Sequence, residues 1–255
     1  MELIKRTIKV GNSAGVLLPK KWLNSQVKVV LSPLNIEKDV LDILTEENLL
    51  KEILGVYLIG SYSRGEQTIE SDIDILVITD NLEKRIKKER YDLLLIAKKT
   101  LEEQLERNIM PLLPMIKEAK TIINKSLLES YKNSKLTRKN LRWHIEIIRS
   151  GLKVSRAALN LENEVDSKYA SDAVAYSLVF YLRSLYIVES LMKNKKWNNK
   201  DLINLVKKIT GSKLAYEGYV RVKANRKREK RLPLDQAEKL HEYISNKLKD
   251  QEKSI

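Results

Sequence analysis

The chain has 255 residues, 43% of them hydrophobic, which is enough for one large domain or two to three small ones with packed cores. Lys and Arg outnumber Asp and Glu by 48 to 34, and the net charge of +14 favours a polyanionic partner such as nucleic acid or nucleotide phosphates, although a Lys-rich surface explains it equally well. The absence of cysteine excludes disulfides and thiolate metal sites, and no apolar run approaches the ~18–20 residues of a membrane span, so we expect an archaeal-like, cytoplasmic protein with no membrane partner.

The first region, residues 1–34, is predicted to be a small β module. IKRTIKV and VKVVL are β-branched runs typical of strands, and Gly11-Asn12 and Gly15 are turn signals between them. Pro19 can open a short helix at KKWL. About thirty residues cannot bury a core alone, so this module must pack on the rest of the chain or on a second copy of itself.

The second region, residues 35–131, alternates helix and strand patterns and predicts an α/β domain with a mixed sheet flanked by helices. GVYLIG, DIDILVI and YDLLLIA are expected strands, and DVLDILTEENLLKEIL and KTLEEQLERNI are expected helices. We expect NLEKRIKKER to be a charged helix or loop. PLLPMIKEAKTIINKSLLESYK is expected to begin as a proline-broken piece and to continue as a helix.

The third region, residues 136–255, shows helical spacing of apolar residues in four segments and predicts an all-α domain. These segments are WHIEIIRSGLKVSRAAL, YASDAVAYSLVFYLRSLYIVESLM, KDLINLVKKI and LDQAEKLHEYISNKL. Between the last two lies the densest basic stretch, YEGYVRVKANRKREKR. It is either a solvated loop or a nucleic-acid or phosphate contact, with Arg221, Lys223, Arg226, Lys227 and Arg228 as the candidates.

One segment, GVYLIGSYSRGEQTIESDIDILVI, carries the predicted chemistry. A strand delivers Gly60-Ser61 to its end, where glycine lets the backbone approach a phosphate closely and a following short helix can direct amide groups at it. Asp72 and Asp74 lie two residues apart on the next strand, so both carboxylates share one face. Two close carboxylates repel unless a cation lies between them, and Mg²⁺ is the most plausible ion because it also binds phosphate oxygens.

A third carboxylate would complete a two-metal site. Asp92 is the best candidate, since it opens the next strand and can come level with Asp72 and Asp74 in a sheet. Two metals about 3.5–4 Å apart can clamp the attacking and leaving oxygens of an in-line displacement. Arg64 is expected to contact phosphate with its planar guanidinium.

These motifs resemble the DNA polymerase β-like nucleotidyltransferase superfamily, and GSYSRGEQTIESDIDILVI looks like its minimal and kanamycin nucleotidyltransferase groups. The resemblance covers roughly residues 36–130. It implies an enzyme that uses an NTP, with Ser61 binding the triphosphate, Asp72 and Asp74 binding metal, and an aspartate on a later strand completing the triad; Asp92 matches that position by context. The third region is similar to the helical substrate-binding domains that follow such cores.

The first region resembles the AbrB-type swapped-hairpin proteins, in particular short archaeal versions that contain GNSAGVLLPKxWL. The resemblance implies an intertwined homodimer and often DNA binding. Thr7, Lys9, Lys20, Lys21 and Lys28 could then meet phosphates. The alternative is that the hairpin only forms a dimer interface or an extra β layer.

Three functions remain open from the sequence. The first is transfer of a nucleoside monophosphate from an NTP to an unknown acceptor hydroxyl on a small molecule, an RNA or a protein, the last as in antitoxin-type enzymes. The second is a DNA-binding regulator whose nucleotidyltransferase core senses nucleotide. The third is an inactive scaffold. A histidine-based metal site or a Ser-His-Asp triad is not supported, because the chain has only His144 and His241.

Overall fold

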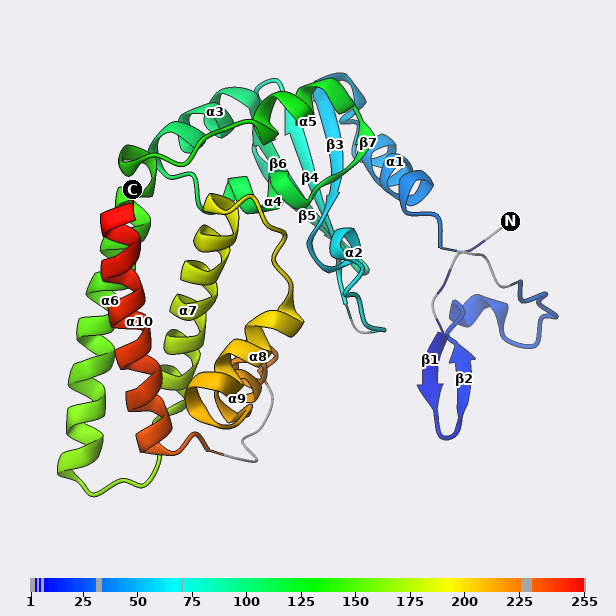
Figure 1. Ribbon diagram of the computed structural model, residues 1–255. Helices are drawn as coiled ribbons and strands as arrows, with labels where there is room; N and C mark the ends of the chain where they lie inside the picture. The colour runs from blue at the N-terminus through cyan, green and yellow to red at the C-terminus, as the bar shows by residue number, and fades with distance from the viewer. Residues whose placement is uncertain are drawn as a thin grey trace. The chain divides into compact units, whose positions relative to one another are not determined.

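The computed structural model describes residues 3, 5, 7–30, 34–69, 71–225 and 231–254 (Figure 1). The chain divides into two compact units, residues 1–38 and 39–255. The first unit holds the predicted hairpin, β1 (Thr7–Val10) and β2 (Ser13–Val16), which pair antiparallel, followed by a 3₁₀ turn, η1 (Lys20–Trp22). Gly11 in the hairpin turn has φ +59°, a conformation that glycine adopts without steric cost.

The strand predicted at VKVVL is not present in its described part, since residues 27–30 form no strand. Val27, Val29 and Val30 are exposed instead. A strand needs a hydrogen-bonding neighbour for its backbone, and β-branched composition alone supplies none.

The second unit contains a five-stranded sheet in the order β5-β6-β4-β3-β7 (Figure 1). It is a mixed sheet, as the sequence predicted. The three inner strands are β3 (Ile53–Ile59), β4 (Ile73–Thr79) and β6 (Tyr91–Ala97). β4 and β6 run parallel, whereas β3 pairs antiparallel with β4. The inner strands are the three predicted apolar runs, and most of their side chains are buried.

The two edge strands were not predicted. Residues 84–88 were expected to be helix or loop, but they form β5 (Lys84–Lys88), in which Ile86 is the single buried side chain among exposed cations. Residues 120–123 were expected to continue a helix, but they form β7 (Lys120–Ile123), which pairs with β3. In both cases the pairing with a buried neighbour outweighs the weak strand pattern of the segment itself.

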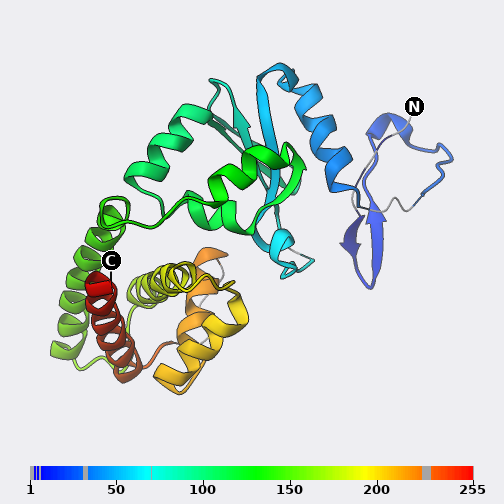
Figure 2. The same ribbon diagram turned by 45° about the horizontal axis from the view of Figure 1, so that its top comes forward.

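Helices cover the sheet and connect its strands (Figure 2). They are α1 (Ile36–Glu46), the 3₁₀ turn η2 (Leu50–Glu52), α2 (Gly60–Arg64), α3 (Lys98–Arg107), α4 (Leu112–Glu118) and α5 (Lys125–Lys132). Leu101 of α3 and Leu113 of α4 are buried in the same core as Tyr57, Leu76 and Ile78 of the sheet. The short α2 lies directly after β3 and places the Gly60-Ser61 motif at the end of an inner strand.

The rest of the unit consists of helices joined by loops. Its described residues contain no strand, and Tyr169 and Pro233 form an isolated bridge. It consists of α6 (Arg138–Glu164), α7 (Asp172–Met192), α8 (Asn199–Thr210), α9 (Leu214–Lys223) and α10 (Leu234–Ser254). α6, α7 and α10 pack against one another, and α9 packs on α7 (Figure 1). The tyrosine-containing part of the basic stretch, which the sequence left open, is therefore a helix.

Among the described helices, only α7 is long and apolar enough to cross a membrane by length and composition. Half of that apolar window is buried inside the protein, as expected of a core helix that packs against α6, α9 and α10. Its aromatic side chains belong to this packing: the rings of Tyr176 and Tyr219 stack with centroids 5.2 Å apart.

Candidate active site

The site begins at the turn between β3 and α2. Gly60 has φ +71°, and a Cβ at this position would overlap the Oδ2 atom of Asp74. Ile59 and Asp74 are direct partners in the antiparallel ladder of β3 and β4, which is why the Asp74 carboxylate lies against Gly60. The glycine of the Gly60-Ser61 motif is thus required both by its backbone conformation and by the carboxylate beside it.

The three predicted carboxylates lie where the neighbouring strands β4 and β6 begin. Asp74 and Asp92 are direct partners in the parallel ladder of β4 and β6, so Asp92 is level with Asp74 as expected. Burial raises the pKa of Asp74, and the negative charges of Asp92 and Asp72 raise it further, while Lys223 and Arg64 lower it. Asp72 is exposed and directly precedes β4. The repulsion among these groups is the electrostatic condition that favours a bound cation.

Asp92 differs from the other two carboxylates because it is already paired. Arg85 of β5 donates two hydrogen bonds to it, from Nε to Oδ1 and from Nη2 to Oδ2, both at 2.7 Å. Lys87 Nζ lies 3.4 Å from Oδ2. The hydrogen bond from Arg85 is the main cause that lowers the pKa of Asp92. The edge strand that the sequence did not predict is the source of both cations.

Arg64, predicted as a phosphate contact, lies between two carboxylates. Its Nη1 donates to Glu118 Oε2 at 2.6 Å, and its Nε donates to Glu66 Oε2 at 2.8 Å. Glu118, at the end of α4, also accepts from the Gly60 N–H at 2.8 Å through Oε1. Burial raises the pKa of Glu118, and Arg64 partly offsets this. Glu118 therefore fixes both the turn at Gly60 and the guanidinium of Arg64.

A second contact ties this turn to the helical part of the unit. Glu66 Oε1 accepts from the backbone N–H of Asn199 at 2.7 Å, and Glu66 Oε2 accepts from Asn199 Nδ2 at 3.0 Å. Asn199 is the first residue of α8. Three of these residues, Glu66, Glu118 and Asn199, were not predicted from the sequence. Their contacts join residues 54 to 133 positions apart, and no local pattern relates positions that meet only in the folded chain.

The helical part also supplies cations to the site. Lys223, the last residue of α9, is close enough to Asp74 to lower its pKa, and Arg183 of α7 has the same effect on Glu118. Lys223 was among the predicted phosphate contacts, and Arg221 lies on the same helix. Arg226, Lys227 and Arg228 lie outside the described residues.

The residues present fit a divalent cation in part. Neither Asp72 nor Asp74 makes a hydrogen bond or an ion pair within 4 Å in the described ranges, so their carboxylate oxygens remain available as the hard ligands that Mg²⁺ prefers. No group of three His, Cys, Asp or Glu side chains in the described part of the chain is arranged to hold a metal ion. Asp92 would have to exchange its bonds with Arg85 to join Asp72 and Asp74, and its assignment as the third ligand stays a prediction.

Comparison with known proteins gives the family. The model of the nucleotidyltransferase domain matches residues 37–198, which is more than half of the chain. No curated protein matches. Two solved structures are similar. One is a nucleotidyltransferase-like protein from Exiguobacterium sibiricum 255-15, with 16% identity and a TM-score of 0.40; the match covers 85% of this chain and 76% of that one. The other is spectinomycin adenyltransferase AAD(9) from Enterococcus faecialis, crystallised with ATP and spectinomycin, with 14% identity and a TM-score of 0.44; the match covers 84% of this chain and 98% of that one.

The matched range contains Gly60-Ser61, Asp72, Asp74 and Asp92 and the sheet that aligns them. It includes Glu66 but ends one residue before Asn199, so the match spans the sheet and the first two helices of the helical part. On this match the chain belongs to the nucleotidyltransferase domain family and is a nucleotidyltransferase.

Proposed function

We propose that this chain transfers a nucleoside monophosphate from an NTP to an acceptor hydroxyl, with Mg²⁺ held by Asp72 and Asp74. The observation that carries the proposal is the Asp74 carboxylate, which lies against Gly60 without a cationic partner within 4 Å in the described chain and beside two further carboxylates. When bound, the metal would neutralise charge on the phosphates and polarise the phosphoryl group that is transferred.

In this proposal the residues of the site have separate roles in binding the metal, the triphosphate and the acceptor. Asp72 and Asp74 hold the cation, and the backbone at Gly60 and Ser61 receives the triphosphate, since the absence of a side chain at Gly60 allows close approach. Lys223 and Arg183 add positive charge from the helical side. Arg64 acts on phosphate only through the part of its guanidinium that Glu66 and Glu118 do not occupy. Asp92 serves as a third ligand or orients the acceptor hydroxyl after it parts from Arg85.

The test uses the position of the label in the nucleotide. The protein is incubated with Mg²⁺ and with NTPs labelled at either the α or the γ phosphate, in the presence of RNA, protein or small-molecule fractions of a cell extract. We expect one fraction to gain the α label and none to gain the γ label. Transfer of the γ label would indicate a kinase-type reaction and would overturn the proposal.

Variants connect the transfer to the carboxylates. Asp72→Asn and Asp74→Asn should each abolish transfer of the α label, because each removes one metal ligand charge. Asp80→Asn is the matched control, since Asp80 is an exposed aspartate just beyond the other end of β4. The proposal fails if all three variants transfer label at the wild-type rate in the fraction that accepts it. The fraction that accepts the label also identifies the class of acceptor.

A further inference from the structure

Helix α6 carries two apolar stripes with the same spacing. The first faces the core and consists of buried positions that follow one another at intervals of four and three residues: Leu141, Ile145, Ile148, Leu152, Ser155 and Leu159. The second has the same intervals but lies two positions further along: Trp143, Ile147, Ser150, Val154, Ala157 and Leu161. Two positions correspond to roughly 200° around a helix, so the second stripe lies on the face opposite the core.

The second stripe is exposed. The exposed fractions are 56% for Trp143, 44% for Ile147, 68% for Val154 and 62% for Leu161. Single exposed apolar residues are common on protein surfaces, but these four recur with the 3.5-residue period of a helix that packs against another helix. The two positions that interrupt them, Ser150 and Ala157, are small and uncharged. Most of the other exposed positions of α6 carry charge, which sets the stripe apart as a seam. We refer to these six positions as the α6 seam.

The two kinds of seam position differ in the residues they hold. Ile147, Val154 and Leu161 occupy one kind, while Trp143 and the small Ser150 and Ala157 occupy the other kind. When two copies of such a helix pack antiparallel, one kind of position meets the other kind across the interface, so Ser150 meets a large aliphatic side chain and Trp143 does not meet its own copy. A parallel arrangement would place equal positions opposite each other, with Trp143 against Trp143 and Ser150 against Ser150. The side-chain sizes therefore favour an antiparallel pair.

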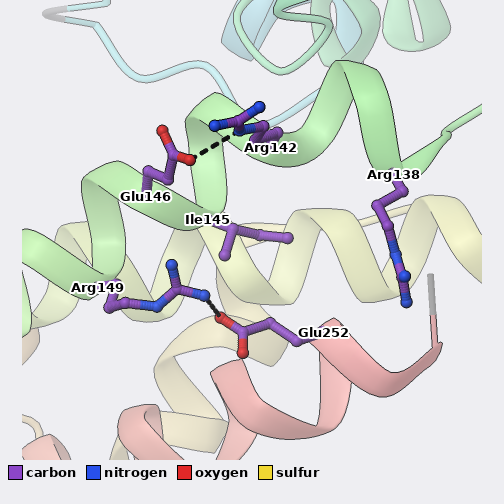
Figure 3. Close-up of a pocket in the computed structure, with 6 residues that line it drawn as sticks. All are labelled: Arg138, Arg142, Ile145, Glu146, Arg149 and Glu252. Carbon is purple, nitrogen blue, oxygen red and sulfur yellow. Dashed lines mark hydrogen bonds and ion pairs between the residues drawn. The ribbon is translucent and has the colours of Figure 1, made fainter.

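Charge selects the register of that pair. With Ile147 opposite Ser150 of the partner subunit, Trp143 comes opposite Val154 of the partner subunit, and Ala157 and Leu161 lie beyond the paired part of the seam. In this register the flanking Glu146 comes opposite Lys153 of the partner subunit, and two-fold symmetry forms this ion pair twice. Shifting the helices by one heptad instead brings Lys153 against Lys153 of the partner subunit. Glu146 is bound within its own helix by Arg142 and remains 43% exposed, while Arg149 turns away to Glu252 of α10 (Figure 3). The acidic and basic groups that flank the seam thus match in one register.

We propose that the α6 seam is a homodimer interface, in which α6 of one subunit packs antiparallel on α6 of the partner subunit with Glu146 and Lys153 paired across it. This interface is separate from the β1–β2 hairpin, whose resemblance to swapped-hairpin proteins predicts a dimer of its own. The rival occupant is the first unit of the same chain, which also exposes apolar side chains such as Leu17 and Leu23.

The first experiment measures the solution mass of the full chain by sedimentation. Val154→Glu places a charge in the paired part of the seam, opposite Trp143 of the partner subunit, and Met192→Glu places one at an exposed apolar position of α7 outside it. We expect Val154→Glu to halve the mass and Met192→Glu to leave it unchanged. If the hairpin also dimerises, the wild type is a tetramer and Val154→Glu a dimer. A monomeric wild type, or a mass that Val154→Glu does not change, overturns the proposal.

The second experiment tests the occupant and the register without burying a charge in the seam. Glu146→Lys and Lys153→Glu should each weaken self-association at least tenfold, because each creates two like-charge pairs, and the double variant should restore the wild-type association constant. If the double variant is as weak as the singles, the proposed register is wrong. If the seam were covered by the first unit of the same chain, neither single variant would change the mass, and this outcome also overturns the proposal. The exchanges are at exposed positions, so they decide the matter even if Val154→Glu fails to fold.

Discussion

At the scale of single residues, Gly60 determines where Asp74 can lie. Its φ of +71° costs an L-residue roughly 1–2 kcal/mol, and a Cβ would also displace the Asp74 carboxylate. We expect Gly60→Ala to lower the free energy of unfolding by more than that strain and to reduce nucleotidyl transfer about 10²-fold, the loss typical of a catalytic group displaced by about 1 Å. Urea unfolding and a transfer assay measure the two effects.

Gly65 provides the matched control for Gly60→Ala. It has almost the same backbone conformation, with φ +73°, but a Cβ there would meet no atom within 4 Å. Gly65→Ala should show the strain alone, roughly 1–2 kcal/mol of stability, with transfer close to the wild-type rate. Equal losses of activity in the two variants would mean that backbone strain, and not the displacement of Asp74, disturbs the site.

The pairing of Asp92 with Arg85 leads to a prediction about metal dependence. If Asp92 is a third ligand, the cation must compete with two hydrogen bonds of 2.7 Å. Arg85→Gln should then lower the Mg²⁺ concentration for half-maximal transfer by about tenfold, corresponding to a loss of roughly 1.4 kcal/mol of competing interaction. Lys84→Gln, on the same strand but paired with Glu47, should leave it unchanged. An unaltered Mg²⁺ dependence in Arg85→Gln would assign Asp92 a structural role.

At the scale of elements, the inner strands were predictable and the edge strands were not. β3, β4 and β6 are buried on both faces, and burial leaves continuous apolar runs such as those that contain Val56, Leu76 and Leu94. β5 needs only Ile86 to face the core, so its remaining positions are free to carry cations and its sequence lacks a strand pattern. β7 has only four residues and lies between two helices, so it was predicted as part of a continuous helix.

The same distinction applies to the site. Gly60, Asp72 and Asp74 belong to one local motif, so their spacing alone predicted their proximity. The level position of Asp92 followed from the expectation that it opens an adjacent strand. Arg85 comes from a segment that was wrongly predicted as helix or loop, and Glu118 comes from the end of helix α4, far from the motif in the sequence. Their contacts with the site depend on tertiary packing that no local pattern specifies.

Helix α6 also carries a buried histidine that makes stability depend on pH. Burial lowers the pKa of His144 to about 4, and its Nε2 has no hydrogen-bond partner in the described chain. The unfolded chain binds this proton below its ordinary pKa of 6.5, whereas the folded chain does so only near 4. Lowering the pH from 6.5 to 4 should therefore destabilise the fold, by up to roughly 3 kcal/mol from this residue.

The variant His144→Leu isolates that contribution. It removes the buried imidazole while keeping the volume similar, so the loss of unfolding free energy between pH 6.5 and pH 4 should shrink by up to roughly 3 kcal/mol. His241, whose pKa is also lowered mainly by burial, stays in the variant and accounts for part of the remaining slope. If denaturant titrations at both pH values give the same difference for wild type and variant, His144 is not the source of the dependence.

At the scale of the whole molecule, the site depends on how the sheet and the helical part of the second unit are held together. Asp74 and the Gly60 turn belong to the sheet side, whereas Lys223 and Arg183 come from the helices. The Arg64–Glu66–Asn199 contact joins the two sides next to the turn itself. A change in this contact should consequently alter how tightly a nucleotide is bound between the sheet and the helices more than it alters the chemistry at Asp74.

Asn199→Ala tests this coupling, with Lys200→Ala at the following exposed position as the control. Asn199→Ala loses the hydrogen bond from the Asn199 side-chain Nδ2 to Glu66 and keeps the hydrogen bond from the backbone N–H of residue 199 to Glu66. A hydrogen bond to a charged group contributes about 1.5–3 kcal/mol, so we expect KM for the NTP to rise about tenfold with kcat nearly unchanged. A fall in kcat at constant KM would place the effect on the transition state instead, and would mean that the contact aligns Arg64 for the transfer step and does not hold the two sides together around the nucleotide.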